Sequence, residues 1–271
     1  MIEFLSYSFV QRGLIAGTLV AAACALLGVF LVLKRLSLIG DGMSHVCLTG
    51  VAVALLTSTS PVYMSVPIVM LASAGIMKLV QKFKIYGDAA IGIVSAAGLS
   101  VGLLLTALAG GFNTDLLGYL FGSILTVSAS ELILCAILLI VVLAGLMLCY
   151  RYLISTCFDA PFAHTRGVPV ETVNTVLIMI TAVAVVLAFK VVGIFLISAL
   201  LIIPPVAALL VSRTFKQVLW LSALFGVASV WLGVYLSFVF DIPSGATIIL
   251  VNLAWLLGAY VWSKLGATHA R

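Results

Sequence analysis

Long runs of uncharged, mostly apolar residues recur along almost the whole chain, and they limit its fold more than any other feature. Roughly 20 such residues form a helix that crosses a bilayer. Only 8% of the 271 residues are charged and 65% are hydrophobic, whereas about 25% of an ordinary soluble domain is charged. The sequence therefore predicts an all-α, polytopic bundle of transmembrane helices. The runs of suitable length between successive charges are 12–34, 88–115, 131–151, 171–190, 190–213, 216–241 and 241–264.

We expect eight or nine spans within a single membrane domain, residues 1–271. The uncharged run after His45 reaches Lys78, which is too long for one span, and the polar segment 57–61 divides it into two. Eight spans are the alternative to nine, because the stretch around Lys190 is short enough to be a break within one helix. The nine expected spans are 12–34, 38–57, 62–83, 88–110, 129–151, 170–189, 191–212, 217–240 and 244–263.

Lysines and arginines fall at alternate ends of the successive spans. Such residues are enriched in cytoplasmic loops, and nine spans allow nearly all of them to be cytoplasmic at once. That arrangement places the N-terminus outside and the C-terminus in the cytoplasm. The formal net charge of +5 is therefore explained by membrane topology, and no nucleic acid partner is expected. The residues on the predicted cytoplasmic side are Lys34, Arg35, Lys78, Lys82, Lys84, Arg151, Arg166, Arg213, Lys216, Lys264 and Arg271.

Asp41 and His45 are two ionisable residues that lie within an expected span, whereas nearly every other charge lies at the end of one. They are four residues apart, so a helix places both side chains on one face. An aspartate within a span costs about 2.5 to 3.5 kcal/mol and normally faces a cavity or a partner. Oxygen and imidazole donors together suit zinc, manganese or iron. In the structural alternative, Asp41 only caps the helix start and His45 bonds a neighbouring carbonyl.

A short surface helix is expected between the fifth and sixth spans, on the cytoplasmic side at 158–167. An aspartate can cap its start, a proline is tolerated in its first turn and a glycine can end it. Two phenylalanines four residues apart form an apolar edge that suits a groove on a soluble partner. The alternative is an interfacial loop whose phenylalanines pack on the bundle. The residues that define this helix are Phe158, Asp159, Pro161, Phe162 and Gly167.

Two further segments interrupt the apolar pattern. Adjacent prolines at 204 and 205 remove two backbone donors late in a span, so the segment 192–205, which includes Ser198, is a candidate gate or kink. A kink that only serves helix packing is the alternative. The segment Tyr119–Ser123 follows Asp115 in a stretch too short to span, and it is expected to form a half-helix.

Common catalytic and nucleotide-binding motifs are absent from the sequence. No GxxxxGK[ST] surrounds any lysine, so the chain has no P-loop for ATP, and neither HExxH nor GxSxG occurs. These absences favour a transport subunit over an enzyme.

Four stretches together resemble the permease subunits of ATP-binding-cassette importers for zinc, manganese or iron. They are 34–45, 158–163 with Gly167, 193–205 and 243–247. The resemblance extends from the first span to the last and implies a fold similar to that of cobalamin- and siderophore-importer permeases. It also implies multi-pass insertion in the cell membrane of a prokaryote.

The resemblance further implies a set of partners. Two permease chains, identical or different, surround one path in the lipid bilayer. A cytoplasmic ATP-binding subunit is present in two copies, and an extracytoplasmic protein delivers the metal. ATP binds to the partner, the ion is cargo, and no cofactor is bound permanently. Asp41 and His45 then become metal ligands along the path, and Phe158 to Gly167 becomes the coupling helix docked on the ATPase.

This chain departs from the family pattern in places, and the resemblance leaves the metal open. The family often has alanine and proline after the histidine, where this chain has Cys47 and Thr49, and a glutamate where Pro161 stands. Cys47 is either a soft ligand that favours zinc or a small buried thiol. The other functions to consider are a permease for a siderophore or cobalamin, and an ion-coupled secondary transporter that needs no ATPase.

Overall fold

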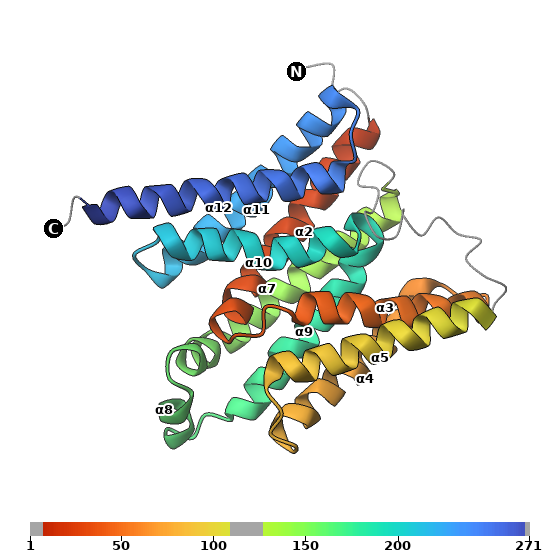
Figure 1. The fold of residues 1–271 in the computed structure, drawn as a ribbon, viewed down its shortest axis with the longest axis horizontal. Coiled ribbons are helices and arrows are strands. Elements are labelled where there is room, and N and C mark those ends of the chain that lie inside the picture. Colours follow the sequence, from red (N-terminus) through yellow and green to blue (C-terminus); the bar gives the residue numbers. More distant parts are fainter. Residues whose placement is uncertain (1–7, 109–126, 269–271) are drawn as a thin grey trace.

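The computed structural model describes residues 8–108 and 127–268, and these residues form helices with no strand (Figure 1). Within them, nine helices are long and apolar enough to cross a membrane. The predicted all-α membrane bundle is thus confirmed. The predicted half-helix at 119–123 lies outside the described residues. The helices are α2 (Ser8–Leu33), α3 (Ile39–Leu56), α4 (Pro61–Gln81), α5 (Gly87–Leu108), α7 (Ala129–Phe158), the short α8 (Ala160–Thr165), α9 (Val170–Val192), α10 (Ile194–Val211), α11 (Phe215–Phe240) and α12 (Ser244–Thr268).

Helix α7 is longer than the sequence pattern indicated. The span was expected to end at Arg151, but α7 continues to Phe158 and contains 30 residues. A charged side chain does not interrupt backbone hydrogen bonding, and no glycine or proline occurs between Arg151 and Pro161. At 1.5 Å per residue, α7 is about 45 Å long, against about 30 Å for the hydrocarbon core of a bilayer. Its last turns can therefore carry α8 beyond the apolar layer.

A single glycine separates α9 from α10. Gly193 has φ +82°, a left-handed conformation that glycine adopts at little cost, and it ends α9 while starting α10. The chain turns back at this point, so that α9 packs against α4 and α7 whereas α10 packs mainly against α2 and α12 (Figure 1). The two are thus separate helices, each long and apolar enough to cross a membrane, which favours nine spans over eight.

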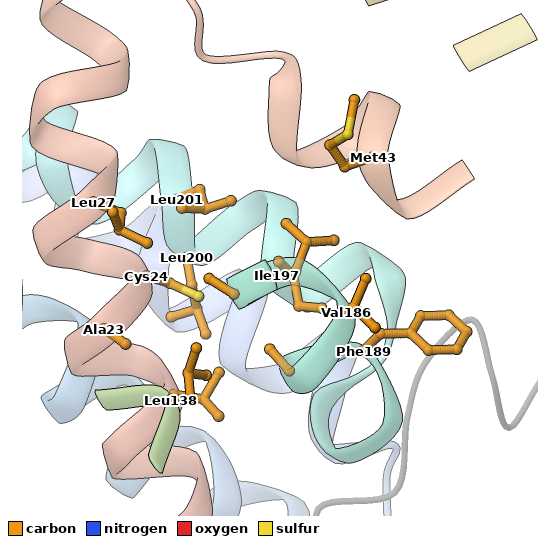
Figure 2. Packing of buried hydrophobic residues seen from close by; sticks show 14 of the residues in the cluster. Ala23, Cys24, Leu27, Met43, Leu138, Val186, Phe189, Ile197, Leu200 and Leu201 are labelled. Atoms are coloured by element: carbon orange, nitrogen blue, oxygen red, sulfur yellow. The ribbon is translucent and has the colours of Figure 1, made fainter. Parts of the chain in front are cut away.

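The bundle consists of two packed groups. Helices α3, α4 and α5 contact one another, and α2, α10, α11 and α12 form the second group. Helix α7 packs on α2 and α9, and α9 joins the two groups. One buried cluster extends across both groups. Figure 2 shows Leu27 of α2, Leu138 of α7 and Leu200 of α10 within that cluster. Met43 and Val46 of α3 belong to the same cluster, so α3 is part of the core and is packed against the helices that can move it.

The connections collect at two ends of the bundle. Helix α8, the α10–α11 turn and the C-terminal end lie toward the left of Figure 1, and the α3–α4 turn and the end of α5 lie toward the right. The chain therefore passes repeatedly between the two ends, as a multi-pass membrane protein must.

Candidate functional site

The candidate site begins where α2 turns into α3. Arg35 has φ +59° in this connection, and α3 follows a Leu38 N-cap that provides no side-chain hydrogen bond. Asp41 lies in the first turn of α3 but does not cap it. Asp41 therefore does not have the capping role that was the structural alternative, and its carboxylate remains available to bind a ligand.

Asp41, His45 and Ser95 form a compact polar group. His45 Nδ1 lies 4.0 Å from Asp41 Oδ2, and the two side chains are 42% (Asp41) and 29% (His45) exposed. The same Nδ1 lies 2.8 Å from Ser95 Oγ on α5. His45 thus bonds a hydroxyl of another helix, and not a neighbouring carbonyl. Sequence reasoning missed Ser95, which is 50 residues away along the chain.

Close contact between α3 and α5 holds this group in place. Thr49 Oγ1 donates a hydrogen bond of 2.5 Å to the carbonyl of Gly98. A Cβ atom at Gly98 would lie 2.6 Å from Val46 Cγ2, and one at Gly102 would lie 3.0 Å from the Thr49 backbone nitrogen. Small residues commonly allow such approach between membrane helices. The spacing Ser95, Gly98, Gly102 along one face of α5 was the sequence signal that could have identified Ser95.

Cys47 does not belong to this polar group. Its side chain is completely buried, and its backbone carbonyl accepts a hydrogen bond from Ser65 of α4. Two residues along a helix correspond to a rotation of about 200°, so Cys47 and His45 occupy different faces of α3.

The pair offers one carboxylate and one imidazole to a metal ion. Within the described residues, no group of three or more His, Cys, Asp or Glu side chains is close enough to hold a metal. Two protein ligands are fewer than the four that a structural zinc site uses. The described residues of one chain thus provide a partial ligand set, which suits transient binding better than permanent retention.

Helix α8 lies in the segment where a surface helix was expected, with different bounds. It begins at Ala160, and the Asp159 side chain accepts a 2.9 Å hydrogen bond from the Phe162 backbone nitrogen. Gly167 follows with φ +79°. Phe158 is the last residue of α7, and its ring packs edge-on against Phe215 at 6.0 Å.

The exposed surface of α8 is both apolar and basic. The Phe162 side chain is 54% exposed, and the Arg166 guanidinium lies 5.0 Å from the centre of its ring. Aromatic residues and arginine are both enriched at protein–protein interfaces.

The proline segment lies inside a continuous helix. Pro204 and Pro205 are buried within α10, and Ser198 donates to the Ile194 carbonyl one turn earlier. Because the prolines lack N–H groups, the carbonyls of Leu200 and Leu201 lose their usual helical donors. The two prolines thus remove two backbone N–H donors, as expected, but α10 continues through them to Val211.

Lys34 links three helices near α8, a role that the sequence pattern did not reveal. Its ammonium donates 2.7 Å and 2.5 Å hydrogen bonds to Thr156 of α7 and Asn174 of α9. Burial lowers the pKa of the Lys34 ammonium from its ordinary value of 10.5. From its sequence context, Lys34 was expected to lie at the cytoplasmic edge of a span, at the start of the stretch 34–45. It lines a cavity of about 550 Å³ together with Arg35, Asp88, Cys157, Ala160 and Asn174.

The sequence matches known membrane transport proteins over nearly its full length. The model of the ABC 3 transport family matches residues 6–263. A manganese transport system membrane protein of Halalkalibacterium halodurans is 34% identical over 96% of this chain and 89% of its own. A high-affinity zinc uptake system membrane protein of Haemophilus influenzae is 28% identical, over 88% of this chain and 92% of its own.

Solved structures share the fold. PsaBC from Streptococcus pneumoniae, solved in complex with a Fab, has a TM-score of 0.85 and 30% identity, over 96% of this chain and 95% of the other. An inward-facing putative metal-chelate type ABC transporter has a TM-score of 0.68 at 20% identity, over 94% and 88%, which shows likeness of fold. The family match, the relatives and the nine apolar helices agree, and this chain is a multi-pass membrane protein that belongs to the ABC 3 transport family.

Proposed function

We propose that this chain is the permease subunit of an ATP-driven importer of divalent transition metal ions, namely manganese, zinc or iron. The observation that carries the proposal is the Asp41 and His45 pair on one face of α3, with the ring nitrogen 4.0 Å from the carboxylate. Relatives named for manganese transport and for zinc uptake support the same class of cargo. The ion is cargo, and it leaves the protein after each cycle.

A partly exposed carboxylate in a membrane span supports a path rather than a lipid-facing surface. Exposure of such a group to hydrocarbon costs several kcal/mol, so charged side chains in spans face water-filled cavities or partners. Two permease chains around one path would each contribute one Asp41 and one His45. Together the two pairs offer four ligands, enough for a dehydrated ion that must bind and then leave.

ATP hydrolysis belongs, in this proposal, to two copies of a cytoplasmic ATP-binding subunit that dock on α8. The exposed Phe162 and the adjacent Arg166 support docking. Lys34 supports transmission, because its hydrogen bonds join the start of the α2–α3 connection to α7 and α9 on either side of α8. A push on α8 then moves Asp41 and His45, and the path opens to each side in turn. The bend-prone segment of α10 with Ser198, Pro204 and Pro205 is the proposed gate.

The proposed orientation follows from the basic residues. The connections that carry Lys34, the α4–α5 turn and α8 are cytoplasmic, the N-terminus is outside and the C-terminus is inside. The membrane is the cell membrane of a prokaryote, and an extracytoplasmic protein delivers the metal to the opposite face.

Proteoliposomes that contain this chain and its ATPase provide the test. We expect accumulation of manganese or zinc that requires ATP and that falls at least tenfold when Asp41→Asn and His45→Gln are combined. Asp241→Asn is the matched control, because it removes an exposed carboxylate at the end of α11 and should leave uptake intact. Uptake that survives loss of both side chains contradicts the assigned ligands. Uptake driven by a proton gradient without ATPase, or of a metal chelate but not the free ion, contradicts the proposed class.

A further inference from the structure

His45 has two polar neighbours on the same ring nitrogen, and they come from different helices. Ser95 Oγ of α5 lies 2.8 Å from Nδ1, and Asp41 Oδ2, one turn earlier on α3, lies 4.0 Å from the same atom. The hydroxyl is therefore at hydrogen-bond distance, and the carboxylate is near enough to act through its charge.

These neighbours select one form of the neutral imidazole. A neutral histidine carries its proton on either Nδ1 or Nε2, and the other nitrogen keeps a lone pair. An ionised carboxylate attracts an N–H dipole and repels a lone pair, so the charge of Asp41 favours the proton on Nδ1. The Ser95 oxygen can accept that proton's hydrogen bond. The lone pair is then left on Nε2, the other ring nitrogen, which is the one able to bind a cation.

Resting on the proposed function, we infer that Ser95 is a positioning residue for metal transport. Its hydroxyl oxygen accepts the Nδ1–H of His45, fixes the orientation of the ring and presents Nε2 to the cation. Residues that hold a ligating histidine through its second nitrogen typically change metal affinity 10- to 100-fold when they are lost.

Close contacts between α3 and α5 on both sides of Ser95 hold its backbone near His45. A Cβ atom at Gly42 of α3 would lie 3.7 Å from Ser95 Cβ and 2.7 Å from the side chain of Ile91, one turn earlier on α5. One turn later, the Thr49 hydroxyl is bonded to the Gly98 carbonyl. Ser95 is half-buried and lies between two points of close contact with α3, as a positioning residue requires.

The first test reads the proton position directly and needs no transport. The chain contains three histidines, so His164→Asn and His269→Asn leave His45 as the sole imidazole. Nitrogen-15 NMR of the complex in bilayers, with histidine labelled in this chain alone and at a pH well above the ordinary histidine value of about 6.5, distinguishes a protonated from an unprotonated ring nitrogen. We expect Nδ1 to be protonated in this background, the Nε2–H form to increase with Ser95→Ala, and Ser95→Thr to restore Nδ1–H.

The second test measures transport with the same substitutions. Ser95→Ala should raise the KM for manganese or zinc about tenfold or more with a smaller effect on kcat, and Ser95→Thr should recover most of the affinity. Ser100→Ala is the matched control, because Ser100 lies on the same helix and is exposed; it should change neither the NMR signals nor KM.

The possible results separate this inference from the proposed function. A dominant Nε2–H form in the parent background, or a proton position unaffected by Ser95→Ala, overturns the role of Ser95 even if metal is transported. An Nδ1–H form that depends on Ser95, in a protein that carries no metal, supports the hydrogen-bond assignment while the proposed function fails.

Discussion

The backbone carbonyl of Leu201 in α10 lies directly against Gly28 of α2. A Cβ atom at position 28 would be 2.1 Å from the Leu201 oxygen and 2.7 Å from Pro205 Cγ. Pro205 has no N–H to offer this carbonyl, so the oxygen is free of its usual helical partner and faces the neighbouring helix. The proline pair therefore has a packing role between α2 and α10, in addition to its proposed part in a gate.

Gly28→Ala should destabilise the protein. The new methyl group meets a backbone oxygen that cannot rotate away, and overpacking of this kind costs about 1 to 3 kcal/mol. Thermal unfolding in detergent should show a lower Tm. Gly258→Ala is the control, because a Cβ atom there has no neighbour within 4 Å, and its Tm should be unchanged or higher. Equal Tm values for the two variants would contradict the tight contact between α2 and α10.

Gly98→Ala should impair transport by separating α5 from α3. Its methyl group would lie 2.6 Å from Val46 Cγ2 and 2.9 Å from the Val46 backbone, so α5 must shift and carry Ser95 away from His45. We expect metal uptake in proteoliposomes to fall about tenfold, which corresponds to about 1.4 kcal/mol. Gly92→Ala on the same helix meets no atom within 4 Å and should transport normally. Normal uptake by Gly98→Ala would show that the close contact between α3 and α5 does not control the position of Ser95 and His45.

Lys34→Met should weaken the coupling of ATP hydrolysis to uptake. The substitution keeps the length of the side chain but removes both hydrogen bonds, to Thr156 and Asn174. Hydrogen bonds from charged groups are worth about 1.5 to 3 kcal/mol when buried, and partial exposure reduces that value here. We expect fewer metal ions transported for each ATP hydrolysed, with hydrolysis itself retained. Lys82→Met, an exposed lysine after α4, is the control, and an identical ratio in both variants would contradict this role.

Phe162→Ala should weaken association with the ATP-binding subunit. Truncation of a hot-spot residue at the centre of a protein interface costs about 2 kcal/mol or more, and about 1.4 kcal/mol corresponds to tenfold in affinity. Copurification of the two subunits measures the effect. Tyr63→Ala is the control, since Tyr63 is 79% exposed at the start of α4, at the other end of the bundle. Retention of the ATPase by Phe162→Ala would exclude this ring as a docking contact.

The class of fold followed from the sequence because a bilayer imposes a length and a polarity on every span. Nine apolar segments met that requirement, and each corresponds to a helix in the described structure. The ends of the helices were harder to predict. The charge of Arg151 indicated that the fifth span ends there, but α7 continues for about two more turns, to Phe158. The spacing of Asp41 and His45 was also sufficient to place both on one face, because a helix repeats every 3.6 residues whatever surrounds it.

Tertiary structure alone decided which groups from distant segments meet. The bond between His45 and Ser95 and the bonds from Lys34 to Thr156 and Asn174 join residues 50, 122 and 140 positions apart. Nothing in local periodicity determines such partners, because they depend on which helix faces pack and on where glycines let two backbones approach. The sequence therefore determined the membrane helices and the chemical groups they carry. Helix packing determined which of those groups form a site.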